Sequence, residues 1–244
     1  MPSRLVDCVR HARIRARTFA GALAGKNVYA LSDLRLPVRR VGGRPSDGYG
    51  AWFVAADLLR PGSTVYSVGI GDDISFDVAL IRQFNVAVHA FDPTPESLAW
   101  LRDQEPPAGF TAHPFGIADI DGSVRFHPAA PAGWISHSIL ETAFTKRDTV
   151  ELPVKRLATV MEALGHGRID LLKMDIEGAG LAVIEDMVAS RLDVRQLLVE
   201  LHHRALPRGA LATRRSIALL RGAGFRLARM APSGEEFTFV HVRG

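Results

Sequence analysis

The fold of this chain is decided by one stretch, Val65-Tyr66-Ser67-Val68-Gly69-Ile70-Gly71-Asp72-Asp73-Ile74-Ser75-Phe76-Asp77. An apolar run rich in β-branched residues ends at Val68, and Gly69 and Gly71 then remove side chains where the backbone must bend. Beyond the glycines, apolar residues recur at near-helical spacing at Ile74, Val78 and Ile81. The pattern predicts a buried strand, a glycine turn and a helix start, where free backbone N–H groups face a nucleotide ligand.

The charge at this turn indicates which nucleotide. A dinucleotide site places a pyrophosphate at the helix N-terminus, where negative charge on the protein is unfavourable. Asp72 and Asp73 occupy that place, and Ile74 stands where a dinucleotide motif has its third glycine. Two carboxylates repel a phosphate but suit an ammonium and a sulfonium. The turn therefore favours S-adenosyl-L-methionine, which has no phosphate, over NAD. An NAD-dependent dehydrogenase and an ordinary turn without a ligand are the alternatives.

Acidic and histidine side chains follow the other predicted strands. Asp92 lies 21 residues after Gly71, at the end of an apolar run, where an acidic residue holds the hydroxyls of a ribose. Asp175 follows the apolar run 169–174, and His202 follows the run 196–201. Because ligands bind at the carboxyl ends of parallel strands, we expect these side chains to line one site.

These residues resemble the FkbM-type S-adenosylmethionine-dependent O-methyltransferases, over residues 48 to 242. The resemblance rests on five stretches: Val65–Asp77, Ala90–Pro95, Gly116–Asp119, Leu171–Gly178 and Glu200–His202. It implies an α/β fold of the class I methyltransferase type. That fold is a doubly wound, seven-stranded, mostly parallel sheet whose final strand is antiparallel. Here it would follow an N-terminal helical extension.

The resemblance also assigns the cofactor site. The residues expected to contact S-adenosyl-L-methionine are Gly69, Gly71, Asp73, Ser75, Asp92, Pro93, Ile117 and Asp175. Among them, Ile117 would pack against the adenine. Ser67 stands where many methyltransferases carry an acidic residue for the methionine amine. Asp72, Asp73 or Asp175 could supply that contact instead. Asp175 is also a candidate catalytic residue, because it would lie opposite the cofactor sulfur and could bind the acceptor.

Methyl transfer to a hydroxyl needs positioning and removal of a proton. We expect His202 to be the general base, because histidine titrates near the operating pH and follows a strand end. Strand alternation puts Glu200 on the same side, where it could orient the imidazole. Reserve bases are His203 and His137. Asp175, Glu200 and His202 could instead hold a divalent cation; we assign no metal ligand.

Composition places the chain among single-domain α/β proteins. It has 244 residues, 47% of them hydrophobic, which is ample for one large core. One cysteine, Cys8, excludes an internal disulfide and a cysteine metal cluster. The sequence contains no apolar run long enough to cross a membrane, and arginines interrupt Met1–Arg17 where a signal peptide would be continuously apolar. We therefore expect a cytoplasmic protein.

Positive charge gathers at the N-terminus. Residues 1–44 hold ten Lys and Arg against two Asp, a net of +8, although the whole chain carries +4. Residues 1–47 are predicted to be a basic helix (2–24) with a connecting segment, and 48–244 the S-adenosylmethionine-binding domain. We expect the helix to pack on that domain or on a second copy of the chain. Binding to nucleic acid or to an anionic lipid surface is the disfavoured alternative, because an apolar stripe suggests a core-facing helix and no aromatic residues interleave the arginines. The stripe consists of Leu5, Val9, Phe19 and Leu23.

Three local predictions bear on the site. Residues 48–53 are predicted to lead into a helix that runs through Leu59, with Tyr49 and Trp52 either over the cofactor mouth or in the core. Phe110–Ile117 is predicted to be one strand, forming a hairpin with Val124–Phe126. Residues 127–149 are predicted to be a lid or acceptor-binding loop, which carries Trp134, Ser136, His137 and Ser138.

Together these features predict an O-methyltransferase that acts on a hydroxyl of a sugar or polyketide-type small molecule. The acceptor class comes from the resemblance alone. N- or carboxyl-methylation is one alternative. A non-catalytic protein that keeps the methyltransferase fold is another, opposed by Gly69, Gly71, Asp92 and His202.

Overall fold

The computed structural model describes residues 20, 32–129, 137–139, 148–176, 178–204 and 209–242. The predicted basic helix therefore lies outside the described residues, apart from Ala20. The same holds for Glu177 and for most of the predicted lid, including Trp134 and Ser136.

A central sheet of seven strands organises the fold, in the order β12-β13-β11-β10-β3-β4-β5. Its strands are β3 (Thr64–Val68), β4 (Ala87–Phe91), β5 (Phe110–His113), β10 (Leu171–Met174), β11 (Gln196–Glu200), β12 (Phe225–Met230) and β13 (Glu236–His241). β5, β4, β3, β10 and β11 pair in parallel, whereas β13 is antiparallel to both β11 and β12. This order, with an inserted antiparallel last strand, confirms the class I methyltransferase fold.

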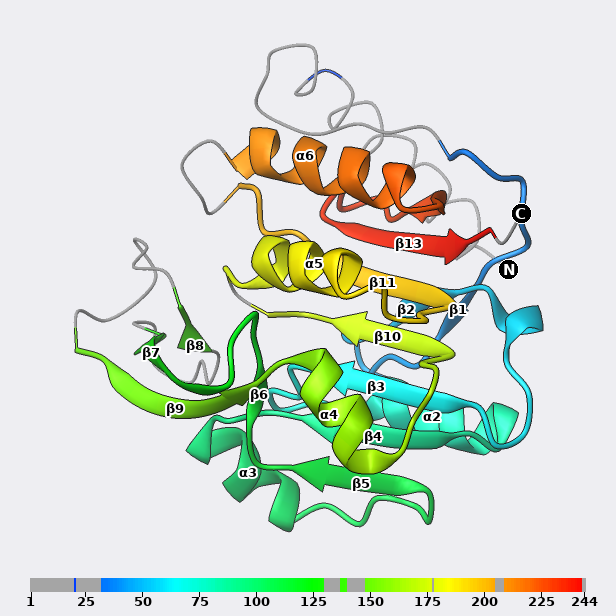
Figure 1. Cartoon of the computed structure of the whole chain (residues 1–244). Helices are drawn as coiled ribbons and strands as arrows, with labels where there is room; N and C mark the ends of the chain where they lie inside the picture. The colour runs from blue at the N-terminus through cyan, green and yellow to red at the C-terminus, as the bar shows by residue number, and fades with distance from the viewer. Residues whose placement is uncertain are drawn as a thin grey trace.

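Helices cover both faces of this sheet, as Figure 1 shows. The helices are α2 (Ser75–Phe84), α3 (Pro95–Arg102), α4 (Leu157–Leu164), α5 (Gly180–Ala189) and α6 (Gly209–Gly222). On β3, Tyr66 and Val68 belong to the core that also contains buried residues of α4, α5 and α6, while Val65 belongs to the core with α2 on the other face. Successive side chains of a strand point to opposite faces, so one apolar strand supplies two cores.

The prediction that residues 48–53 lead into a helix ending at Leu59 is wrong. Residues Trp52–Val54 form strand β2, antiparallel to β1 (Arg39–Val41), and only a short 3-10 turn, η1 (Ala56–Leu58), follows. Gly48 and Gly50 adopt positive φ, which interrupts a helix, and Trp52 and Val54 are buried with the two-residue period of a strand. Trp52 belongs to the core, whereas Tyr49 is 61% exposed. The β1–β2 pair spans the predicted 47/48 domain boundary, which stays a prediction.

The prediction of one strand over Phe110–Ile117 is also wrong. The chain turns at Pro114, which cannot donate to a ladder, and Phe115 N–H donates to the carbonyl of His113 (2.9 Å). Gly116–Ile117 is a separate strand, β6, in a second sheet of order β6-β9-β7-β8. The other members are β7 (Gly122–Pro128), β8 (His137–Ser138) and β9 (Val150–Lys155). Because β9 lies between β6 and β7, the predicted hairpin does not form.

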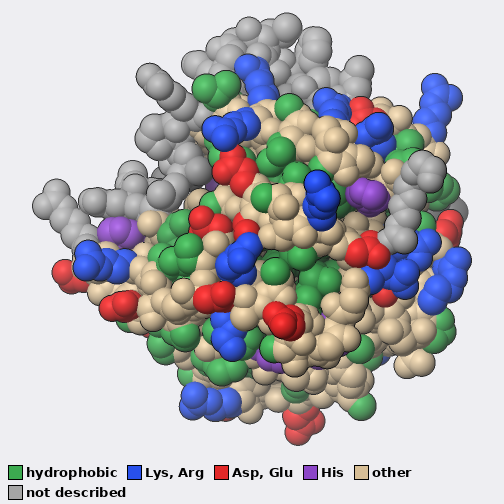
Figure 2. Space-filling view, in the orientation of Figure 1, with side chains coloured by type: hydrophobic (Ala, Val, Ile, Leu, Met, Phe, Trp, Pro, Cys, Tyr) green, Lys and Arg blue, Asp and Glu red, His purple; other side chains and the backbone are tan. Residues whose placement is uncertain are grey.

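Two further features concern the surface. In the described part of the chain, helices are too short or too polar to cross a lipid bilayer. On the face shown in Figure 2, acidic and basic side chains are interspersed among apolar ones. The expectation about nucleic acid stays a prediction, because the arginine-rich residues 1–19 are outside the described part.

Candidate active site

The glycine turn joins β3 to α2 at the carboxyl edge of the sheet. Gly69 (φ +83°) and Gly71 (φ +58°) are both in the left-handed region, as predicted for a tight turn. A Cβ on Gly69 would meet the backbone oxygen of Asp175, so β3 and β10 approach each other closely here. A Cβ on Gly71 would meet no atom within 4 Å in the described residues. The turn is therefore tight on the side of β10 and open at Gly71, where a ligand can approach the backbone.

Asp92 braces this turn. Its Oδ2 accepts hydrogen bonds from the N–H groups of Ile70 (2.9 Å) and Gly71 (3.1 Å), and Oδ1 accepts one from Thr94 (2.8 Å). The side chain is buried at 4% exposure. Asp92 thus lies beside the glycine turn, and its carboxylate fixes the turn relative to the end of β4. Its predicted contact with a ribose stays a prediction.

The adenine end of the predicted site is formed by Pro93 and β6. A Cβ on Gly116 would lie 3.2 Å from Pro93, so the strand passes directly against that ring. Ile117 follows, at 3% exposure. The structure brings Pro93 and Ile117 into one region near Asp92, and the contact with adenine stays a prediction.

Asp73 and Ser75 form the start of α2. Asp73 Oδ1 accepts the N–H of Ser75 (2.9 Å), and its Oδ2 accepts the Ser75 hydroxyl (3.2 Å). Asp73 therefore satisfies donors at the first turn of the helix, in the manner of a capping residue. The Ser75 hydroxyl in turn accepts the N–H of Gly43 (3.1 Å).

Arg44 is a residue of this site that the sequence did not reveal. Its guanidinium forms an ion pair with Asp72 (2.8 Å) and lies 3.7 Å from Asp73 Oδ2. The acidic turn is thus partly neutralised by the connecting segment, which sequence reasoning had treated as separate. Only the concentration of arginines in residues 1–44 hinted at such a contact.

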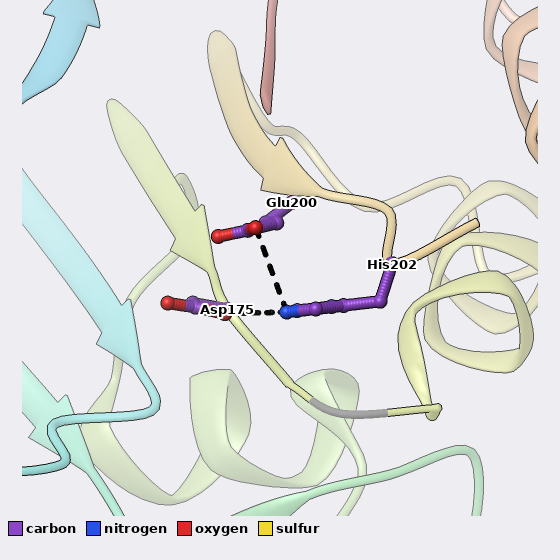
Figure 3. Close-up of side chains that lie close together, drawn as sticks. All are labelled: Asp175, Glu200 and His202. Atoms are coloured by element: carbon purple, nitrogen blue, oxygen red, sulfur yellow. Dashed lines mark ion pairs between the residues drawn. The ribbon is translucent and has the colours of Figure 1, made fainter. Parts of the chain in front are cut away.

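Three side chains meet at the ends of β10 and β11. His202 Nε2 lies 3.6 Å from Asp175 Oδ1 and 3.6 Å from Glu200 Oε1, and Figure 3 shows the three side chains pointing toward one another. One ligand atom from each falls within 4.8 Å of the other two. Asp175 directly follows β10 and Glu200 is the last residue of the neighbouring parallel strand β11, which explains why residues 25 positions apart converge.

Several acidic side chains lie close together in this group and disfavour one another's charged forms. Burial and the charge of Asp175 raise the pKa of Glu200, while His202 opposes the shift. Glu236, the cross-strand partner of Glu200 on β13, has a pKa raised to about 7 by burial and by Asp175. Sequence reasoning missed Glu236 because strand pairing is not visible in the chain order. A positive charge appearing on His202 would relieve this repulsion.

A second missed feature lies beneath the glycine turn. Lys173, at 7% exposure, donates from Nζ to the carbonyls of Gly69 (2.5 Å) and Val68 (3.3 Å). The Trp52 ring lies 5.6 Å from the ammonium. Burial raises the pKa of Asp77 to about 6, and the nearby charge of Lys173 opposes that rise. Lys173 therefore holds the turn from inside the protein.

The reserve histidines lie in other surroundings. His203 is 4% exposed, its Nδ1 lies 3.2 Å from the carbonyl oxygen of Leu201, and burial lowers its pKa. His137 Nε2 lies 3.9 Å from a carboxylate oxygen of Glu96. Of the three candidate bases, His202 is the one that the structure places between Asp175 and Glu200.

Comparisons with known proteins give the family of this chain. A family model described as the methyltransferase FkbM domain matches residues 62–227. The 31-O-demethyl-FK506 methyltransferase FkbM of Streptomyces tacrolimicus is 32% identical over 200 residues, 68% of this chain and 74% of that protein. Probable methyltransferase-like protein 24 of Homo sapiens is 29% identical over 141 residues, 57% of this chain and 32% of that protein.

Among solved structures, the fibrillarin pre-rRNA processing protein of Methanococcus jannaschii aligns with a TM-score of 0.45 and 9% identity, covering 75% of this chain and 68% of that one. The length of the family match and the identity to the Streptomyces protein decide the family. This chain belongs to the FkbM family of S-adenosylmethionine-dependent methyltransferases.

Proposed function

We propose that this protein transfers a methyl group from S-adenosyl-L-methionine to a hydroxyl of a sugar or polyketide-type small molecule. The observation that carries the hydroxyl assignment is the position of His202 between two carboxylates, 3.6 Å from each. A hydroxyl must lose a proton during methylation, and two neighbouring carboxylates stabilise the imidazolium that forms. The relative from Streptomyces is named for 31-O-demethyl-FK506, which supports an oxygen acceptor.

The cofactor, when bound, supplies a methyl group already activated on a sulfonium. The residues present fit such a ligand, since the turn is open at Gly71 and lacks the third glycine of a dinucleotide motif. In this proposal Gly69, Gly71 and Ser75 line the cofactor site. Asp92 binds the ribose, and Pro93 and Ile117 pack against the adenine. Asp72, Asp73 or Asp175 receives the methionine amine.

The chemical step forms one bond and breaks one. The acceptor oxygen forms a bond to the methyl carbon as the carbon–sulfur bond breaks, and the hydroxyl proton passes to His202. Glu200 and Asp175 hold the imidazole in place and stabilise its charge. S-adenosylhomocysteine and the methylated acceptor result.

A second use of the same side chains is supported by their spacing. Ligand atoms of Asp175, Glu200 and His202 lie within 4.8 Å of one another, a set that suits a divalent cation. In that case the cation would bind the acceptor oxygen and lower its pKa, and His202 would be a ligand instead of a base. N- or carboxyl-methylation, and a protein that binds without catalysis, are the further alternatives.

The test is a methyl-transfer assay with labelled S-adenosyl-L-methionine and a panel of hydroxyl, amine and carboxylate acceptors. We expect label only in hydroxyl acceptors and a pH–rate profile that rises through one ionisation. His202→Asn should lower kcat by about 10²–10⁴-fold, while His241→Asn, at the far end of β13, should not. Activity abolished by EDTA and restored by Mg²⁺ would favour the cation. Label in amines alone would contradict the hydroxyl assignment.

Two predictions accompany this function. We propose that the protein is cytoplasmic and that its basic N-terminal segment packs on the domain or on a second copy. Cell fractionation and sedimentation of the full chain would test them.

A further inference from the structure

The amino-acid end of S-adenosyl-L-methionine carries a carboxylate as well as an ammonium. The acids of the glycine turn suit only the ammonium, so the carboxylate needs a cationic partner or free N–H groups. In the described part of the chain, two cationic side chains contact the turn, Lys173 and Arg44. Lys173 is buried below it, and its ammonium already serves the carbonyls of Val68 and Gly69. Arg44 is the cation on the accessible side.

The first turn of α2 is unfavourable for an anion. Helix N-termini bind carboxylates through free N–H groups, but the side chain of Asp73 accepts the amide and the hydroxyl of Ser75. A ligand carboxylate at that place would meet the Asp73 carboxylate. A cation elsewhere near the turn is therefore a better partner for the anionic group of the cofactor.

Arg44 is held over the turn in a defined position. Its guanidinium donates to the backbone carbonyl of Asp72 (2.8 Å), pairs with the Asp72 carboxylate (2.8 Å), and lies 5.0 Å from the centre of the Tyr49 ring. Its side chain remains 35% exposed, so part of the fork can reach a ligand. A guanidinium has five N–H donors and binds carboxylates in two-point geometry.

The segment 42–50 brings this arginine between the two halves of the site. At one end, Gly43 N–H donates to the Ser75 hydroxyl on α2. At the other end lies Tyr49, which is 61% exposed as a whole residue; partial burial of its phenol group and the charges of Asp175, Asp72 and Glu200 raise its pKa. The segment thus spans the interval between the glycine turn and the acidic group, which the methionine part of a bound cofactor would occupy.

We propose that Arg44 binds the carboxylate of the methionine moiety, with Asp72 beside it to receive the ammonium. Arg44 and Asp72 form an ion pair whose charges complement those of an amino-acid zwitterion. Arg44 lies outside residues 62–227, so the match to the family domain does not include it. The inference rests on the proposed use of the glycine turn as the cofactor site.

The experiment compares two ligands that differ in the amino-acid end. S-adenosylhomocysteine carries the carboxylate and ammonium, whereas 5′-methylthioadenosine has the same nucleoside without them. Calorimetric titration would be done on the full-length wild type, Arg44→Ala, Arg44→Lys and the control Arg39→Ala. Arg39 lies on β1 with its guanidinium 4.7 Å from the Phe84 ring, away from the turn.

We expect Arg44→Ala to weaken S-adenosylhomocysteine binding about ten- to a hundredfold, the size of a lost hydrogen bond to a charged group. Binding of 5′-methylthioadenosine should change less than twofold, and Arg44→Lys should recover part of the loss. Arg39→Ala should match the wild type with both ligands.

Equal weakening of both ligands would overturn the proposal, because Arg44 would then act only on the shape of the turn. Unchanged binding of both would overturn it as well. A wild type that binds neither ligand would overturn the cofactor site and this inference together. If Arg44→Ala selectively weakens S-adenosylhomocysteine binding but the wild type methylates no hydroxyl, the proposed reaction is contradicted and the role of Arg44 is supported.

Discussion

Replacing Asp92 by asparagine tests how the glycine turn is held. The carboxylate accepts three backbone N–H groups, from Ile70, Gly71 and Thr94, at 2.8 to 3.1 Å, and is nearly fully buried. Asparagine offers one acceptor oxygen and one NH₂ group. Whichever way the amide is turned, its NH₂ must face at least one of these backbone donors.

The loss can be estimated from these contacts. If the amide oxygen faces Ile70 and Gly71, the hydrogen bond to Thr94 is lost and the other two change from charged to neutral acceptors. A hydrogen bond to a charged group contributes about 1.5–3 kcal/mol, so we expect Asp92→Asn to lower the free energy of unfolding by about 2–3 kcal/mol. For a chain of this size that corresponds to a midpoint lower by about 4–12 °C.

The assay is urea unfolding, with and without saturating S-adenosylhomocysteine. Asp57→Asn, at an exposed position on η1, is the control and should unfold like the wild type. Because a ligand that binds the folded state stabilises it, the nucleoside should raise the wild-type midpoint and raise that of Asp92→Asn much less. An unfolding free energy unchanged by Asp92→Asn would refute the bracing role. Full stabilisation of the variant by ligand would refute the ribose contact.

Three other perturbations follow from the structure. Gly69→Ala should lower stability by about 2 kcal/mol or more and remove nucleoside binding, because its positive φ and the nearby Asp175 carbonyl oxygen both oppose a Cβ; wild-type affinity would contradict this. Because folding raises the pKa of Glu200, stability should fall as pH rises from about 4.5 to about 8, and Glu200→Gln should flatten that fall in unfolding measured across the range. Burial and neighbouring histidines lower the pKa of His89 to about 4, so stability should fall as pH falls from 6.5 to 4. His89→Gln should reduce this loss of stability at acid pH. An unchanged loss in the variant would contradict the effect of burial, His166 and His113 on the pKa of His89.

Local sequence signals were sufficient to predict the frame of the site. Gly69 and Gly71 are needed where φ is positive, and the apolar runs on either side have the lengths of a strand and a helix. The meeting of Asp175 and His202 was predictable because the carboxyl ends of neighbouring parallel strands share one edge. The glycine turn is thus predicted from a short-range pattern, and the meeting of Asp175 and His202 from a general rule of sheet geometry.

The parts that could not be predicted depend on contacts between distant residues. Arg44 meets Asp72 only because segment 42–50 folds back on α2, and no local pattern encodes that approach. Glu236 reaches Glu200 through the register of an antiparallel pair. Residues 52–54 form a strand because β1 offers an edge, whereas the sequence alone indicated only a segment that leads into a helix. In each case tertiary pairing outweighed local preference.

The most direct test of the account is calorimetric titration of the full-length protein with S-adenosylhomocysteine, with NAD as the control ligand. The account predicts binding of S-adenosylhomocysteine that Asp92→Ala abolishes, and no binding of NAD, because Asp72 and Asp73 stand where a pyrophosphate would lie. Binding of NAD without S-adenosylhomocysteine, or binding of neither, would contradict the assignment of the glycine turn as a methyl-donor site.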